Sequence, residues 1–168
     1  MNQCRVVITR KCNLKCKYCC MEYPEVLETF KTVNSMQDIF EHKDYDVFAV
    51  SGGEPTLNYT RLQNVISDIK INTTAKVYLW TNGILLTPEY LQVNKDILDG
   101  VNISVHEGSW NYAKWFKLNR VMPIRLHIWE KLSNDELRNF CKTQDIRLNK
   151  WVLDECEKEE DRFILEEV

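Results

Sequence analysis

The chain has 168 residues and a mass of 20.0 kDa, enough for one well-buried core but too little for two ordinary domains. Its residues are 44% hydrophobic and 28% charged, and the mean hydropathy of -0.40 excludes a disordered or membrane-embedded protein. No apolar run approaches the length of a membrane span, and the N-terminus lacks the apolar core of a signal peptide. We therefore expect a single domain over residues 1–168, located in the cytoplasm and without a membrane partner.

The formal net charge of -3 hides an uneven distribution of charge along the chain. Residues 1–21 carry five basic side chains and no acidic one, whereas residues 154–168 carry eight acidic and two basic side chains. Two solvated surfaces are the simplest explanation. Alternatively, the basic segment attracts an acidic protein or an anionic ligand. A nucleic-acid-binding chain would show a stronger basic excess, so we do not expect nucleic acid as a partner.

Short apolar runs typical of buried strands alternate along the chain with segments of helical spacing. The predicted strands cover residues 5–9, 46–50, 76–81, 101–105, 124–128 and 146–152. The predicted helices cover residues 25–40, 56–71, 87–98, 110–118 and 133–141, the last beginning with a capping box of Ser133 and Glu136, and residues 153–168 form an acidic tail or a last helix. This alternation indicates right-handed βαβ units around a parallel sheet.

The polar residues within the later strands indicate a curved sheet. Val101, Ile103 and Val105 would face the helices, which leaves Asn102 and Ser104 on the opposite side, and the strands before and after alternate in the same way. A face lined with asparagine, histidine, arginine and tryptophan cannot be a dry core, because buried polar groups need partners. The pattern therefore predicts an α/β fold, a partial (β/α)6 barrel with parallel strands, that holds ligands at the carboxyl ends of the strands.

Three cysteines, Cys12, Cys16 and Cys19, directly follow the first predicted strand. Thiolates this close in sequence converge on one point, and three of them suit an iron-sulfur cluster or a thiolate-rich metal better than a disulfide. Zinc normally takes four ligands from two spaced pairs, and the second pair is missing here. Cys20 directly follows the third cysteine and has no assigned role, while the remaining cysteines show no second-cluster spacing.

Two further turns follow the next two strands. Gly52-Gly53-Glu54-Pro55 ends the strand over 46–50, and Thr81-Asn82-Gly83 ends the strand over 76–81. The paired glycines indicate a backbone that approaches a ligand closely. The alternative is an ordinary strand-to-helix turn in which the carboxylate lies near a helix N-terminus. Because the carboxyl ends of parallel strands meet at one edge, we expect both turns to lie beside the cysteine loop.

The order of these three motifs resembles the radical S-adenosylmethionine (SAM) superfamily, over roughly residues 5–110. By this resemblance, Cys12, Cys16 and Cys19 bind three irons of a [4Fe-4S] cluster, and the fourth iron chelates the amino and carboxylate groups of SAM. One-electron reduction would cleave SAM to methionine and a 5'-deoxyadenosyl radical that abstracts hydrogen from a substrate. An acidic electron donor, such as a flavodoxin or a ferredoxin, would supply the electron.

The resemblance also implies roles for residues outside the cysteine loop. The Gly52-Gly53-Glu54-Pro55 turn would contact the amino group of SAM, with Glu54 as the ionic partner. Tyr18 would lie against the adenine, Ser104 would contact the ribose, and Asn82 would assist from the neighbouring turn. Each of these roles competes with a purely structural one.

Six side chains on the expected concave face match no family motif and are candidates either for substrate contact or for internal hydrogen bonding. They are His106, Arg125, His127, Trp129, Arg147 and Asn149. The two arginines would suit a carboxylate or a phosphate. They favour an anionic substrate, either a small molecule or a site on a macromolecule, whose identity the motifs do not specify.

Two other functions would explain part of the sequence. A glycyl-radical enzyme activating protein would be similarly small and would require a large protein partner. A non-catalytic iron-sulfur or zinc-binding module would explain the cysteines, but it needs neither the Gly-Gly-Glu-Pro turn nor a polar concave face. We therefore expect a radical SAM enzyme.

Overall fold

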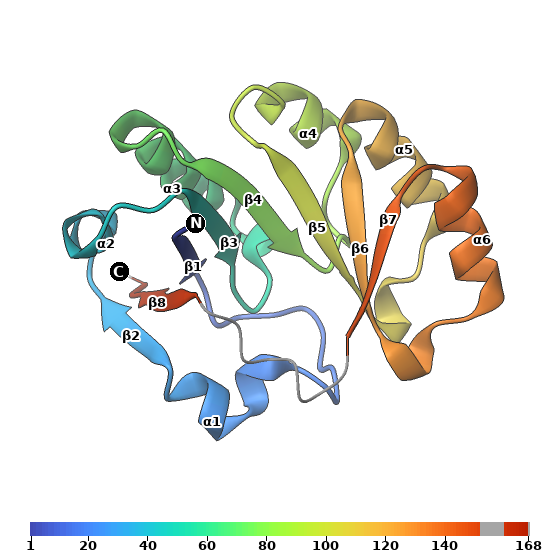
Figure 1. Cartoon of the computed structure of the whole chain (residues 1–168), viewed down its shortest axis with the longest axis horizontal. Coiled ribbons are helices and arrows are strands. Elements are labelled where there is room, and N and C mark those ends of the chain that lie inside the picture. The colour runs from blue at the N-terminus through green and yellow to red at the C-terminus, as the bar shows by residue number, and fades with distance from the viewer. Residues whose placement is uncertain (152–159, 168) are drawn as a thin grey trace.

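The computed structural model describes residues 1–151 and 160–167, which form one open sheet of parallel strands in the order β2-β8-β1-β3-β4-β5-β6-β7 (Figure 1). The strands are β1 (Gln3–Val7), β2 (Phe30–Val33), β3 (Val47–Ser51), β4 (Lys76–Thr81), β5 (Gly100–Val105), β6 (Ile124–Trp129), β7 (Arg147–Trp151) and β8 (Asp161–Leu165). The predicted α/β fold, a partial barrel of parallel strands, is confirmed. The six predicted strands lie side by side in sequence order, and two more extend the sheet beyond β1.

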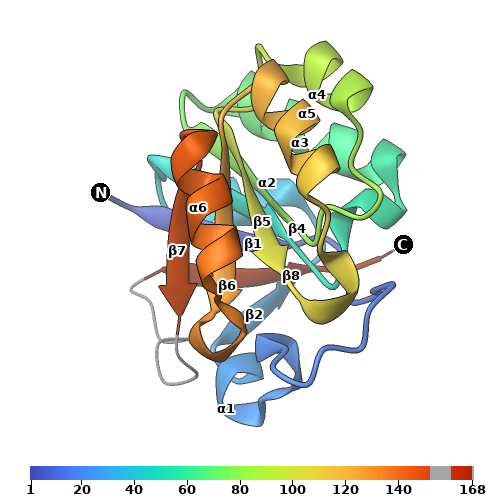
Figure 2. The ribbon, with the colours of Figure 1, turned by 90° about the vertical axis from the view of Figure 1, so that its right-hand side faces the viewer.

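The larger helices cover the outer, convex face of the sheet (Figures 1 and 2). The α-helices are α1 (Pro24–Leu27), α2 (Met36–His42), α3 (Tyr59–Asn72), α4 (Pro88–Asn94), α5 (Tyr112–Val121) and α6 (Asp135–Thr143). Short 3-10 turns are η1 (Cys20–Glu22), η2 (Pro55–Leu57), η3 (Glu107–Ser109) and η4 (Glu130–Leu132). None of the helices in the described ranges is long and apolar enough to cross a membrane.

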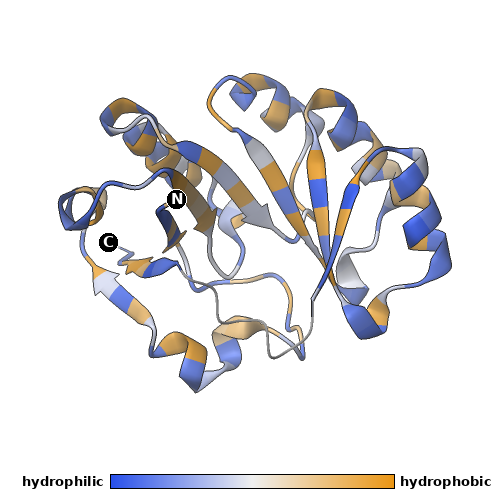
Figure 3. Cartoon of the chain, viewed as in Figure 1, coloured by the Kyte–Doolittle hydropathy of each residue, from blue (hydrophilic) through white to orange (hydrophobic). Residues whose placement is uncertain are grey.

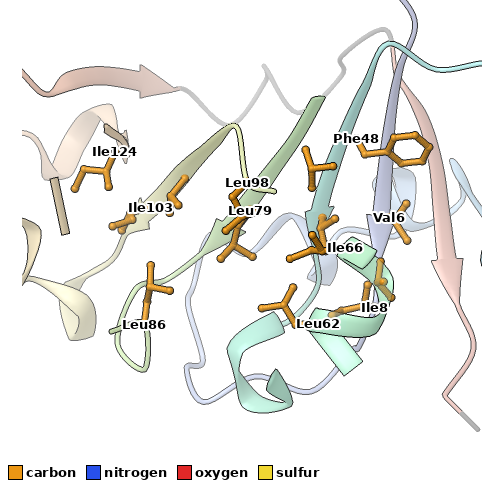
Figure 4. Close-up of a cluster of buried hydrophobic side chains, with 14 of the residues drawn as sticks. Val6, Ile8, Phe48, Leu62, Ile66, Leu79, Leu86, Leu98, Ile103 and Ile124 are labelled. Carbon is orange, nitrogen blue, oxygen red and sulfur yellow. The ribbon is translucent and has the colours of Figure 1, made fainter. Parts of the chain in front are cut away.

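Alternation along the strands separates the core from the concave face, as predicted (Figure 3). Val101, Ile103 and Val105 of β5 are buried among the helices, while Asn102 and Ser104 point to the other side. The core continues through the inner strands to α3, where Leu62 and Ile66 of the helix pack against the sheet (Figure 4). The helices therefore cover one face of the sheet, and the polar residues are left on the other.

The single helix predicted over residues 25–40 is wrong. The structure has α1, β2 and α2 in this segment. Ser35 begins α2 with a capping box, because its hydroxyl accepts from the Asp38 N–H and the Asp38 carboxylate accepts from the Ser35 N–H. The β-branched residues before this cap form a strand that pairs with β8.

The predicted helix at the C-terminus is wrong over residues 161–165, which form β8 between β1 and β2. Phe163 and Leu165 belong to the hydrophobic core, and Ile164 between them is buried as well, as in a strand covered on both faces. Residues 152–159 of the predicted acidic tail lie outside the described residues. At α6 the cap is Asn134 instead of Ser133, because the Asn134 side chain accepts from the Leu137 N–H.

Candidate functional site

A cavity of about 260 Å³ opens at the carboxyl ends of the strands, beneath the cysteine loop. It brings together residues from all three predicted motifs and from the concave face of the sheet. The side chains and backbone that line it belong to Arg5, Cys12, Leu14, Cys16, Tyr18, Cys19, Cys20, Met21, Val26, Phe30, Ser51, Gly52, Gly53, Trp80, Thr81, Asn82, Ser104, His106, His127, Trp151, Glu160 and Arg162. The expected meeting of the three turns at one mouth is thus observed.

The paired glycines are required by the cysteine loop itself. The Gly53 N–H donates to the Thr9 carbonyl at 2.7 Å, and the Glu54 N–H donates to the Lys11 carbonyl at 2.7 Å. A Cβ atom on Gly53 would lie 2.2 Å from the Lys11 carbonyl oxygen, and one on Gly52 would lie 2.6 Å from the Thr9 oxygen. The turn therefore supports the start of the cysteine loop and also lines the cavity, which requires a backbone without side chains.

Glu54 connects the turn after β3 to the turn after β4. Its Oε1 accepts from the Thr56 hydroxyl at 2.5 Å, the Thr56 N–H at 3.1 Å and the Thr81 hydroxyl at 2.6 Å, and its Oε2 accepts from the Asn82 N–H at 2.7 Å. The side chain is completely buried and does not line the cavity. A buried carboxylate needs this full set of donors. Its neighbour Pro55 is also buried and does not line the cavity.

Asn82 continues this network into the cysteine loop. Its side-chain amide donates to the Asn13 side-chain oxygen at 2.7 Å, and its own side-chain oxygen accepts from the Ile84 N–H at 3.0 Å. Gly83 has a φ of 78°, in the region that favours glycine, and its N–H donates to the Thr81 hydroxyl at 3.0 Å. Hydrogen bonds thus run from the turn after β3 through Glu54 and Asn82 to the loop that carries the cysteines.

Three cysteine side chains, those of Cys12, Cys16 and Cys19, line the cavity close to one another. Burial and the neighbouring thiols of Cys19 and Cys12 raise the pKa of Cys16 to about 11, and burial raises the pKa of Cys19. The thiols therefore interact electrostatically, and binding to metal would relieve the cost of forming the thiolates. Within residues 1–151 and 160–167, no three Cys, His, Asp or Glu side chains are placed to share one metal ion. In a cluster each thiolate binds a different iron, so its ligands need not meet at one point.

The concave-face candidates separate into two groups. Ser104, His106 and His127 line the cavity. His127 lies 2.8 Å from the Asn102 side-chain oxygen, and its ring centroid is 4.3 Å from that of Trp80. Burial lowers the pKa of His106, which favours a neutral imidazole.

The other four candidates lie outside the cavity lining. The Trp129 ring packs against Tyr18 with ring centroids 3.7 Å apart, so it supports an aromatic residue that does line the cavity. Arg125 lies over the Tyr78 ring at 5.3 Å, and Arg147 is exposed on the edge strand β7. Asn149 is half-buried on the same strand. The arginine pair expected at the substrate is therefore not in the cavity.

The cavity contains a different arginine pair that sequence reasoning missed. Arg5 on β1 lies next to Arg162 on β8, and Glu160 bonds to both. Arg5 could have been found from its position in the first strand, where it alternates with the core residues Cys4 and Val6. Arg162 could not, because its segment was assigned to a helix.

The family model of the Radical SAM superfamily matches residues 6–154, most of the chain. The chain belongs to the radical SAM superfamily. This is a superfamily of enzymes whose cofactors are a [4Fe-4S] cluster and SAM, and Cys12, Cys16 and Cys19 are the residues suited to hold the cluster.

Relatives with assigned names share a smaller region. A protein from Methanococcus maripaludis named "Probable GTP 3',8-cyclase" is 42% identical over 110 residues, which cover 60% of this chain and 35% of that protein. A "GTP 3',8-cyclase" from Clostridium botulinum is 31% identical over 115 residues, covering 62% of this chain and 35% of the relative. The chain thus spans about a third of the length of these curated relatives.

Solved structures agree with the fold. The structure of a histidine-tagged anSMEcpe with bound AdoMet has a TM-score of 0.56 and 16% sequence identity, and the match covers 89% of this chain and 51% of the other. At this identity the likeness supports the partial-barrel fold alone.

Proposed function

We propose that this radical SAM enzyme reductively cleaves SAM and uses the resulting 5'-deoxyadenosyl radical to abstract hydrogen from a substrate bound in the cavity. The observation that carries the proposal is the hydrogen-bonded network that holds the cysteine loop, the Gly-Gly turn and Asn82 around one cavity. When bound, the cluster supplies the electron that splits the sulfonium of SAM. The protein supplies binding, orientation and the exclusion of water.

The positions of the motif residues suggest how SAM is held. Gly52 and Gly53 line the cavity, and we place the methionine part of SAM beside their backbone. Glu54 accepts four hydrogen bonds from protein donors, so we assign it to positioning this turn and Asn82. This replaces the direct ionic contact expected from the resemblance. Tyr18, braced by Trp129, faces the cavity and is our candidate for adenine contact.

Ser104, His106 and His127 line the cavity, and we assign Ser104 to the ribose and the two histidines to substrate contact. The hydrogen bond to Asn102 and the Trp80 ring orient His127, so that it presents a fixed edge to a bound molecule. A neutral His106 could accept a hydrogen bond or a proton from the substrate.

The electron donor and the cellular compartment are also proposals. Four basic residues around the cysteine loop are exposed, namely Arg10, Lys11, Lys15 and Lys17. They support docking of an acidic electron donor such as a flavodoxin or a ferredoxin. The cysteines in the described ranges are free thiols, which supports a reducing compartment such as the cytoplasm.

The decisive experiment is anaerobic reconstitution of the cluster, followed by dithionite and SAM. We expect release of 5'-deoxyadenosine and methionine even without substrate, at a slow rate. A chain that assembles a clean cluster and binds SAM but releases no 5'-deoxyadenosine would contradict the proposal.

The names of the relatives make GTP the first compound to test as a substrate. Because the chain covers 35% of those proteins, we propose GTP as a starting point and not as the substrate itself. GTP as the substrate would be supported if GTP stimulates formation of 5'-deoxyadenosine and is itself converted. An unchanged rate of 5'-deoxyadenosine formation would exclude GTP.

A further inference from the structure

A buried group of three charged residues forms the wall of the cavity at β1 and β8. The Arg5 Nε donates to Glu160 Oε1 at 2.7 Å, and the Arg162 Nε donates to the same oxygen at 3.3 Å. The Gln3 side chain donates to Glu160 Oε2 at 3.0 Å, and the Arg162 Nη1 donates to the Thr29 hydroxyl at 3.0 Å. The two arginines are register partners on adjacent strands, so their side chains point to the same side of the sheet.

These three side chains together carry a positive charge, because two guanidinium groups contact one carboxylate. The exposed fractions of the side chains are 16% for Arg5, 7% for Arg162 and 2% for Glu160. All three line the cavity. Charges shielded from bulk water act more strongly on a nearby ion than charges on an open surface do. The wall therefore favours an anion over a cation in this part of the cavity.

With respect to residues 1–151 and 160–167, the Arg5 guanidinium has donors left to offer. Its Nε donates to Glu160, and its guanidinium carbon lies 4.8 Å from the centroid of the Trp80 ring. Its terminal NH2 groups donate no hydrogen bond to any residue in the described part of the chain. A guanidinium held in this way offers paired N–H groups that match a carboxylate or a phosphate.

We propose that Arg5 and Arg162, positioned by Glu160, form a subsite for an anionic group of the substrate, a carboxylate or a phosphate. The inference rests on the proposed function, since it assigns the substrate class of the same cavity. It moves the anion site from the concave face of β6 and β7 to the opposite wall at β1 and β8. Arg162 lies on β8, beyond residue 154, where the family match ends.

A structural role is the competing explanation, because Glu160 could simply hold β1 and β8 together. The two explanations predict different effects for Glu160→Gln, whose side-chain oxygen can still accept from both arginines while the negative charge is lost. As an anion subsite, the wall gains positive charge, and an anion should bind about threefold or more tightly. If Glu160 only holds β1 and β8 together, the Glu160→Gln variant has a weaker contact between the strands and should not bind an anion.

The test uses the chain loaded with cluster and saturated with SAM, titrated calorimetrically with pyrophosphate and, separately, with malonate. The two probes separate a phosphate site from a carboxylate site. We expect Arg162→Gln to weaken binding of the preferred probe by about tenfold or more, because a charge-assisted hydrogen bond is lost. Arg125→Gln is the matched control, since Arg125 lies on the concave side but outside the cavity lining, and it should bind as the wild type does.

Thermal unfolding checks that each variant is folded. If Arg162→Gln does not fold, anion binding is measured with Glu160→Gln and Arg162→Lys instead. The Arg162→Lys variant should keep measurable anion binding, because it keeps the positive charge. Equal affinity in Arg162→Gln and wild type, or an equal loss in Arg125→Gln, would overturn the subsite.

The titrations do not depend on turnover of SAM. A wild-type protein that binds pyrophosphate through Arg162 but releases no 5'-deoxyadenosine would overturn the proposed function and leave the subsite standing. A protein that releases 5'-deoxyadenosine but binds neither anion would overturn the subsite alone.

Discussion

The carboxylate of Glu54 accepts a hydrogen bond from the Asn82 N–H at 2.7 Å, and this buried acid joins the turn after β3 to the turn after β4. Asn82 in turn reaches Asn13 in the cysteine loop. The geometry of the cluster loop therefore depends on a residue that does not line the cavity.

Glu54→Gln is expected to destabilise the protein by about 1–3 kcal/mol, because one oxygen becomes an NH2 group that faces a donor in a buried site. SAM affinity should fall as well, through displacement of the two turns. Urea denaturation and SAM titration of the reconstituted protein measure the two effects. Glu41→Gln, on the exposed surface of α2, is the control and should change neither. A variant with wild-type stability and weaker SAM binding would instead favour direct contact.

Gly53→Ala is expected to disturb the cysteine loop, because its Cβ would lie 2.2 Å from the Lys11 carbonyl oxygen. Overpacking of this kind costs about 1–3 kcal/mol, and here the strain falls on the loop that binds the cluster. Iron content after reconstitution should drop. The matched control is Gly108→Ala, where the Cβ would lie 3.1 Å from a flexible Leu14 methyl group. Equal iron in both variants would refute this explanation.

Cys16→Ala should lose the cluster, because only two of the three assigned thiolates remain. The measurement is iron and sulfide content together with the visible absorption of the reconstituted protein. Cys20→Ala and Cys141→Ala should keep wild-type iron, since neither belongs to the spaced triplet. Retained iron in Cys16→Ala, or lost iron in Cys20→Ala, would show that the ligand assignment is wrong.

His106 gives a testable dependence of stability on pH. Burial lowers its pKa below the ordinary 6.5, so the unfolded chain binds a proton more readily than the folded chain does. The contribution of neutral His106 to the free energy of unfolding is fully present above pH 6.5, and it is lost as the pH falls toward the lower pKa of the folded state. The difference in unfolding free energy between wild type and His106→Gln should therefore shrink from pH 8 to pH 5. A difference that stays constant or grows would contradict burial of a neutral imidazole.

Much of the architecture could be read from local patterns. The strand over 76–81 matches β4 residue for residue, and the alternation in β5 separated core from cavity correctly. Local patterns failed for strands whose pairing partners lie far away in the sequence. β8 pairs with β1 from the other end of the chain, and β2 is a strand because β8 lies beside it. Strand formation in such segments depends on their neighbours more than on their own residues.

The sequence by itself determined the family and the turns around the cysteine loop, and it predicted Cys12, Cys16 and Cys19 as the cluster ligands, because closely spaced thiols and a Gly-Gly turn carry their chemistry locally. Only the tertiary structure decided which arginines reach the cavity. Arg125 lies over the Tyr78 ring and Arg147 is exposed on the edge strand β7, so neither lines the cavity, whereas pairing of β1 with β8 brings Arg5 and Arg162 together. It also decided that Glu54 accepts four hydrogen bonds from the protein and has no exposed surface. Burial and hydrogen-bond partners are set by segments far apart in the chain, which no local pattern records.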